Sequence, residues 1–283
     1  MKDTESFSHL WSPLEKHLDG IQTIYVATDG IFNKISLNTL YDSKNEKYLL
    51  EEYNVHYLSN IKELIELDDS GNKQKKSISL YGNPKYDLPG DGTGIAGTFI
   101  SPLPGTEIEV NLIEDLLAGS NWSTTIKIDA VASEKNIKEG ENTNILHIAT
   151  HGFFLNDNNP EQEFYSLENN PLMRSGLLLA GAENTFAGNR IVINSSVDGE
   201  DGVLTAYEVM NMDLSNTDLV ILSACETGLG ETKNGEGVYG LQRAFTIAGA
   251  NSIILSLWKV DDEATKDLMI SFYQQIIDGK DKF

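Results

Sequence analysis

The chain has 283 residues and a formal net charge of −22, from 21 Lys and Arg against 43 Asp and Glu. This acidic balance argues against nucleic acid or an anionic membrane as the main partner. The single cysteine cannot form an internal disulfide, no apolar run reaches the roughly 18–20 residues of a membrane span, and the N-terminus lacks the apolar core of a signal peptide. We therefore expect a globular cytoplasmic protein of one or two domains.

The first quarter of the chain, residues 1–75, is predicted to form a small α/β subdomain. Apolar residues recur at helical spacing over 6–19 and predict an amphipathic helix, with Leu10, Trp11, Leu14 and Leu18 on its apolar side. Asp29-Gly30 lies between two apolar runs and predicts a β-hairpin. The hairpin strands are expected at 21–28 and 31–37, further strands at 48–50 and 56–58, a helix at 61–67 and a polar boundary loop at 68–76.

Residues 76–283 are predicted to form an α/β domain with a mainly parallel sheet and helices on both faces. Its strands are expected at short apolar runs, the pattern of strands that are covered on both sides. Thr106 and Ser133 are predicted N-caps. The expected strands are 77–82, 124–128, 144–150, 219–222 and 252–257. The expected helices are 106–117, 133–140, 241–248 and 263–277, and 202–211 is expected to form a turn and a short helix. A hairpin is predicted between 175–180 and 190–194, and the last helix is expected to bury Leu268, Met269, Phe272 and Ile276.

Two of these strands end in residue types that carry chemistry. The strand at 144–150 leads into His151, and the strand at 219–222 leads into Cys225, the only cysteine. In an open α/β sheet, functional residues gather at the carboxyl ends of the strands. A neighbouring imidazole lowers the pKa of a thiol and produces the nucleophilic thiolate. The sequence therefore predicts a His–Cys pair, and a buried structural cysteine is the alternative.

His147 and His151 are four residues apart, which separates them by about 13 Å along an intact strand. They therefore cannot both serve one thiol or one metal ion, and no metal site is predicted. His151 stands at the strand end before a glycine and is the predicted base. His147 is interpreted as a hydrogen-bonded core histidine.

The glycine-rich loop 228–237 follows the cysteine and is interpreted as one wall of a substrate cleft. It contains a partial phosphate-loop spacing, but Glu236 and Gly237 stand where Lys and Ser or Thr are required. No cofactor is predicted. Glu226 is predicted to contact the substrate. The alternatives are that it orients His151 or that it faces solvent.

The motifs HIATHG at 147–152, SACETG at 223–228, GEG at 235–237 and LWKVDDEAT at 257–265 resemble the CHAT domain, a caspase-like peptidase domain related to separase. YVATDGIFNKISLNTL at 25–40 and YGNPKY at 81–86 extend the resemblance over nearly the whole chain. The resemblance implies a caspase-like three-layer fold. It also implies a cysteine endopeptidase of bacterial signalling or antiphage defence, which cleaves a protein substrate. The N–H groups of Gly152 and Cys225 would then form the oxyanion hole.

A separase segment similar to 258–262 holds a carboxylate that receives an arginine side chain. By that resemblance Asp262, or else Asp261, lies in the specificity pocket, and cleavage follows Arg or Lys. The alternative is that these residues cap a helix beginning at Glu263. CHAT domains usually accompany tetratricopeptide repeats. The chain shows no repeat at their 34-residue period, so a repeat region or activator is expected outside it. A catalytically silent interaction module and a phosphate-binding regulator are the competing functions.

Overall fold

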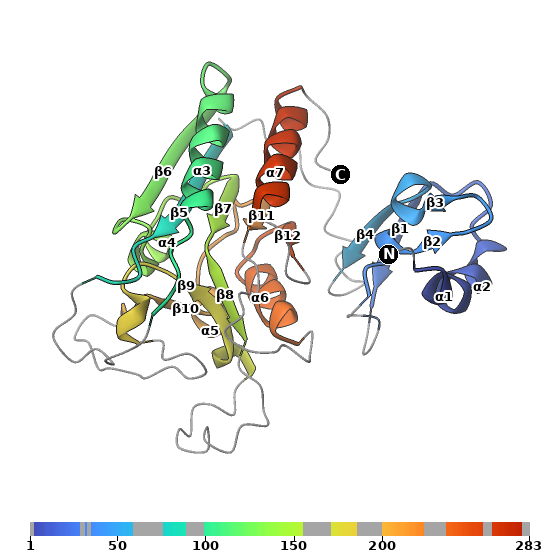
Figure 1. Cartoon of the computed structure of the whole chain (residues 1–283), viewed down its shortest axis with the longest axis horizontal. Coiled ribbons are helices and arrows are strands. Elements are labelled where there is room, and N and C mark those ends of the chain that lie inside the picture. The colour runs from blue at the N-terminus through green and yellow to red at the C-terminus, as the bar shows by residue number, and fades with distance from the viewer. Residues whose placement is uncertain are drawn as a thin grey trace. The chain divides into compact units, whose positions relative to one another are not determined.

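The computed structural model forms two compact units, divided at residues 73 and 74. Figure 1 colours the chain from its N-terminus to its C-terminus. The residues that the structure describes are 3–28, 32, 35–58, 76–88, 99–154, 171–185, 200–223, 236–256 and 262–278.

The N-terminal unit packs helical turns and short strands around its own core. Parallel strands β1 (Thr23–Ala27) and β4 (Asn54–Leu58) form one pair, and antiparallel strands β2 (Tyr41–Asp42) and β3 (Lys47–Tyr48) form another. The helical elements are α1 (Thr4–Ser6), a π-helical turn (Phe7–Trp11), α2 (Ser12–Glu15) and two 3-10 turns (Leu37–Thr39 and Leu49–Glu51). The core consists of Phe7, Trp11, Leu37, Leu40 and Leu49.

Three predictions for this unit are wrong, and one of them is the strand at 48–50, since β3 ends at Tyr48 and Leu49 begins a 3-10 turn. The partner of β1 is β4, and Leu37, the end of the predicted return strand, belongs to a 3-10 turn. Leu14 is 48 % exposed, because the π-helical turn changes the angular phase of the helix, whereas Trp11 is buried as predicted. The predicted turn at Asp29-Gly30, helix at 61–67 and boundary loop up to residue 75 lie outside the described residues.

The C-terminal unit is built on a parallel sheet, as predicted. Its five strands have the order β12-β11-β7-β5-β6. All five residues of β7 are buried, because helices cover both faces of the sheet. The strands are β5 (Lys76–Pro84), β6 (Trp122–Asp129), β7 (Ile145–Ala149), β11 (Leu219–Leu222) and β12 (Ile253–Leu255).

The helices complete the predicted three-layer arrangement (Figure 1). Helices α3 (Pro104–Leu117) and α7 (Asp262–Ile277) pack beside each other on one face of the sheet. The other face is covered by α4 (Glu134–Lys138), α5 (Ala206–Val209) and α6 (Glu236–Ile247). Side chains alternate along a strand, so Ile145 and Ala149 of β7 face α3 and α7, whereas Leu146 and Ile148 face the opposite layer.

A second, antiparallel sheet follows directly from β7. It consists of β8 (His151–Phe154), β9 (Ser175–Leu178) and β10 (Val203–Thr205), with β9 in the centre. The predicted hairpin between 175–180 and 190–194 is wrong, because β8 and β10 occupy both edges of β9. Residues 190–194 themselves lie outside the described residues.

The helix ends were predicted in part. Ser133 caps α4 through its side chain, as expected. Thr106 does not cap α3, because that helix already begins at Pro104, whose fixed φ suits a first helical position.

In α7, Leu268 is 63 % exposed, although it was expected to be buried, whereas Tyr273 is fully buried. The buried face of α7 therefore runs through Met269 and Tyr273, one turn apart.

Candidate active site

The carboxyl ends of β7 and β11 meet at one edge of the sheet, because these strands are parallel neighbours. Leu222 pairs with Ile148, and the Ser223 N–H donates to the Ile148 carbonyl at 3.0 Å. The parallel strand β7 ends at Ala149, so His151 opens β8 and does not end β7 as predicted. Ser223, the last described residue after β11, thus lies beside the end of β7, and His151 follows two residues after Ala149.

His151 has a defined hydrogen-bond partner at this edge. The side chain is buried, and its Nε2 lies 2.7 Å from the carbonyl oxygen of Ser101. Because a carbonyl oxygen only accepts, Nε2 carries the hydrogen and, in the neutral ring, Nδ1 is the basic nitrogen. The partner thus fixes which nitrogen can take a proton.

Tyr86 supports His151 from one side. The two rings pack with centroids 5.4 Å apart. The hydroxyl of Thr150 donates to the Leu178 carbonyl and lies 2.9 Å from the Tyr86 hydroxyl, which therefore donates to it. Burial raises the pKa of Tyr86 to about 12, so the phenol stays protonated and keeps this role near neutral pH. These bonds connect the bend before β8 to the centre of the antiparallel sheet.

His147 is a hydrogen-bonded core histidine, as predicted. It is fully buried, and the alternation along β7 directs its ring toward α3 and α7. Its Nε2 lies 3.0 Å from Glu109 Oε1, and its Nδ1 lies 3.1 Å from the Tyr273 hydroxyl. Both ring nitrogens are therefore engaged inside the fold.

The other predicted site residues are placed only in part. Gly152 follows His151 in β8 and is half-buried. Helix α7 begins at Asp262, one residue earlier than predicted, so Asp262 belongs to its first turn. Cys225, Glu226 and Asp261 lie outside the described residues, as does most of the glycine-rich loop.

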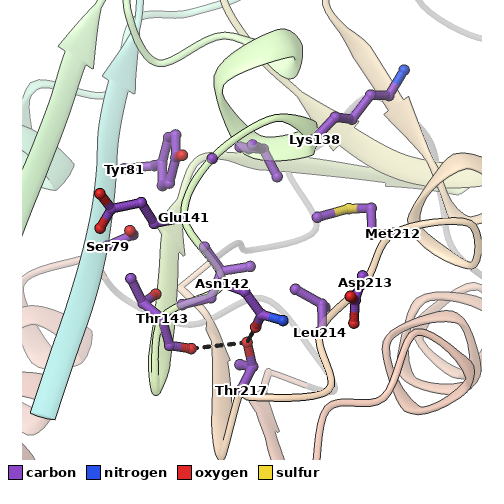
Figure 2. Close-up of a pocket in the computed structure, with 13 residues that line it drawn as sticks. Ser79, Tyr81, Lys138, Glu141, Asn142, Thr143, Met212, Asp213, Leu214 and Thr217 are labelled. Atoms are coloured by element: carbon purple, nitrogen blue, oxygen red, sulfur yellow. Dashed lines mark hydrogen bonds between the residues drawn. The ribbon is translucent and has the colours of Figure 1, made fainter. Parts of the chain in front are cut away.

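A small hollow lies at the opposite, amino-terminal edge of the sheet (Figure 2). Its lining includes Asn142, Thr143 and Thr217, which precede β7 and β11, together with Lys138 and Met212. Functional residues of parallel sheets gather at the carboxyl ends of the strands, so this hollow is not the candidate site.

Within the described residues, no group of three or more His, Cys, Asp and Glu side chains could hold a metal ion. The helices of this described part also include none with the length and apolar character of a membrane span.

Sequence reasoning missed three groups near this edge: the Ser101 carbonyl, Tyr86 and Glu109. A backbone carbonyl leaves no signature in the sequence. Tyr86 is the last residue of the YGNPKY motif at 81–86, and the motif alone does not indicate a contact with His151. Glu109 did leave a signal. It lies one residue before Val110 and four before Ile113, on the face of α3 that enters the core. A charged residue at such a position indicates a buried polar partner.

Comparison with known families identifies the class of protein. The model of the CHAT domain matches residues 5–283, so the chain belongs to the CHAT domain family, as its motifs predicted.

Two curated relatives are tetratricopeptide repeat protein 28 of human and of mouse. The human protein is 23% identical over 296 residues, which cover 96% of this chain and 11% of the relative. The mouse protein is 24% identical over 225 residues, which cover 71% of this chain and 8% of the relative. The chain thus spans about a tenth of the length of these relatives. A solved structure of a short-chain flavodoxin associated with a non-canonical PDU bacterial microcompartment aligns with a TM-score of 0.34 at 14% identity, over 73% of this chain and 99% of that chain.

Proposed function

We propose that this CHAT domain is a cysteine endopeptidase with Cys225 as nucleophile and His151 as general base. The observation that carries the proposal is the hydrogen bond from His151 Nε2 to the Ser101 carbonyl. It leaves Nδ1 as the basic nitrogen, and a base held in one tautomer is a requirement of nucleophilic catalysis. The parallel pairing of β7 with β11 supports the same assignment, since the carboxyl ends of these two strands lie at one edge of the sheet.

The reaction follows from these roles. His151 Nδ1 takes the proton of the Cys225 thiol, and the thiolate sulfur attacks the scissile carbonyl carbon. The N–H groups of Gly152 and Cys225 stabilise the oxyanion of the tetrahedral intermediate. The C–N bond breaks as the imidazolium returns its proton to the leaving amine. Water, deprotonated by His151, then hydrolyses the thioester and releases the acid product and the thiol.

The proposed substrate is a protein cleaved after Arg or Lys. A carboxylate of Asp262, or else of Asp261, would bind the basic side chain through charge-assisted hydrogen bonds. The net charge of −22 favours association with basic segments. The two relatives are named for tetratricopeptide repeats, and we extend the proposal to a repeat region or activator that controls cleavage. A role in bacterial signalling or antiphage defence belongs to the same proposal.

The dyad is tested with a thiol-directed probe, because this needs no substrate. The wild-type protein, Cys225→Ala and His151→Ala are treated with an acyloxymethyl ketone that carries a basic residue next to the reactive carbon. Labelling is expected only in the wild type. Thermal unfolding of each variant serves as the control for folding. Equal labelling of Cys225 in wild type and His151→Ala would refute the dyad and favour a catalytically silent interaction module.

A further inference from the structure

We infer that Glu109, which is buried, and Ser223 form a positioning pair, which fixes the end of β11 and thereby the start of the segment that carries Cys225. The inference rests on the proposed function and adds two positioning residues to it. Neither residue is expected to touch the substrate.

Glu109 reaches the end of β11 from the neighbouring helix layer. It lies on α3 with 3 % exposure, and its Oε2 accepts a hydrogen bond from the Ser223 hydroxyl at 3.1 Å. Its other oxygen, Oε1, lies 3.0 Å from His147 Nε2. A buried carboxylate is costly unless its oxygens are satisfied, and here each oxygen has a donor.

The directions of these hydrogen bonds form one consistent chain. The Glu109 carboxylate only accepts, so in the neutral His147 ring Nδ1 is the acceptor, and the Tyr273 hydroxyl, which keeps its proton because burial raises its pKa, donates to it. His147 Nε2 then carries the ring hydrogen and donates to Glu109. The Ser223 hydroxyl donates to the second carboxylate oxygen. Strand β7 and helices α3 and α7 thereby anchor one residue at the end of β11.

Ser223 is held from two directions. Its N–H donates to the Ile148 carbonyl within the sheet, and its hydroxyl donates to Glu109 outside the sheet. Cys225 is the second residue after Ser223, and two residues of chain span at most about 7 Å. The position of Ser223 therefore restricts where the thiol can lie. A misplacement of about 1 Å can lower a rate about 100-fold, so this restriction matters for the pairing with His151.

The test is Ser223→Ala, which removes the hydroxyl and leaves the hydrogen bond between His147 and Glu109 in place. Ser223→Thr keeps a hydroxyl and is the rescue variant. Thr217→Val is the matched control, since Thr217 is a buried hydroxyl residue at the amino end of the same strand. The Thr217 hydroxyl lies 2.9 Å from the Thr143 carbonyl oxygen and 3.0 Å from Asn142 Oδ1 (Figure 2). The control thus loses hydroxyl hydrogen bonds at the opposite end of β11 from Ser223.

The measurement is the rate of Cys225 alkylation by iodoacetamide as a function of pH, which gives the apparent thiol pKa. His151→Ala defines the response of a thiol without its base. We expect Ser223→Ala to raise the thiol pKa toward its unperturbed value of about 8.5 and to slow alkylation at neutral pH about tenfold. Ser223→Thr should restore most of the rate, and Thr217→Val should match the wild type.

Each other outcome has a separate meaning. If His151→Ala changes the thiol pKa and Ser223→Ala does not, the positioning pair is refuted and the dyad stands. If Thr217→Val has the same effect as Ser223→Ala, the hydroxyl acts only through general stability, and the inference is again refuted. If His151→Ala leaves the thiol pKa unchanged, the proposed function fails, and the positioning role fails with it.

Discussion

The substitution His147→Asn separates the structural histidine from the proposed catalytic one. An asparagine amide reaches the position of the imidazole Nδ1 but not that of Nε2. The variant therefore keeps a partner for the Tyr273 hydroxyl and leaves Glu109 Oε1 without the donor that now lies 3.0 Å away. It also removes ring volume at a site with no solvent exposure. Both changes destabilise the fold and leave His151 in place.

The size of the effect follows from these two losses. A buried acceptor without its hydrogen bond costs about 1–3 kcal/mol, with the upper part of the range fitting a charged group. Partial loss of a buried side chain costs about 0.5–1.5 kcal/mol. The sum is about 3 kcal/mol, a large fraction of the roughly 5–15 kcal/mol by which native proteins are stable. His151→Asn removes a similar ring volume, since His151 is also buried, but it loses only a neutral hydrogen bond to Ser101 worth about 1 kcal/mol, so its total is about 2 kcal/mol.

The assay is urea unfolding, combined with probe labelling of Cys225 on the folded protein. With a slope of about 1–3 kcal/mol per molar urea, His147→Asn should lower the midpoint by about 1 M or more. His151→Asn is the matched control and should lower it less. The His147 variant should keep part of its labelling, whereas the His151 variant should lose it. A folded, unlabelled His147→Asn together with a labelled His151→Asn would reverse the assignment of the base.

Three further outcomes are expected. The double variant of Cys225→Ala and His151→Ala should cleave no more slowly than either single variant, since the pair acts as one unit; additive losses in peptidase assays would contradict this. Asp262→Asn should lower cleavage after Arg or Lys by orders of magnitude in peptide-library profiling, because an amide cannot form the charge-assisted pair; an unchanged profile would restrict Asp262 to the first turn of α7. Burial raises the pKa of Asp201 from 3.8 to about 6, so between these values the folded state holds a proton that the unfolded chain releases. The contribution of Asp201 to the free energy of unfolding therefore falls as pH rises from about 4 to about 6. In Asp201→Asn, the urea midpoint should lack this part of its decrease with pH.

Local sequence pattern was sufficient to predict several strands and the separation of the two histidines. Short apolar runs gave β7 and β11, because only strands covered on both faces are apolar at successive positions. The spacing of His147 and His151 separated a core histidine from a candidate base, because distance along a strand grows with residue number. Motifs around His151 and Cys225 gave the CHAT family, which the family model confirms.

The sequence-based prediction failed where a contact joins residues far apart in the chain. The partner of β1 is β4 instead of the following segment, and β9 lies between β8 and β10 instead of pairing within a local hairpin. Hydrophobic periodicity shows that a segment is a strand, but it carries little information on which strand will lie beside it. The exposed Leu14 has a related cause, since a π-helical turn changes the phase of a pattern that looks regular in sequence.

The environment of the candidate site depends on contacts between residues far apart in the chain. The Ser101 carbonyl selects the tautomer of His151 from 50 residues away, and a backbone carbonyl is present at every position of every sequence. Glu109 bonds Ser223 across 114 residues, because the packing of α3 on the sheet brings one turn of the helix to the end of β11. Local composition fixes which residues carry reactive groups. Long-range packing determines the hydrogen-bond partner of each reactive group. That partner determines which atom of the group can donate or accept a proton.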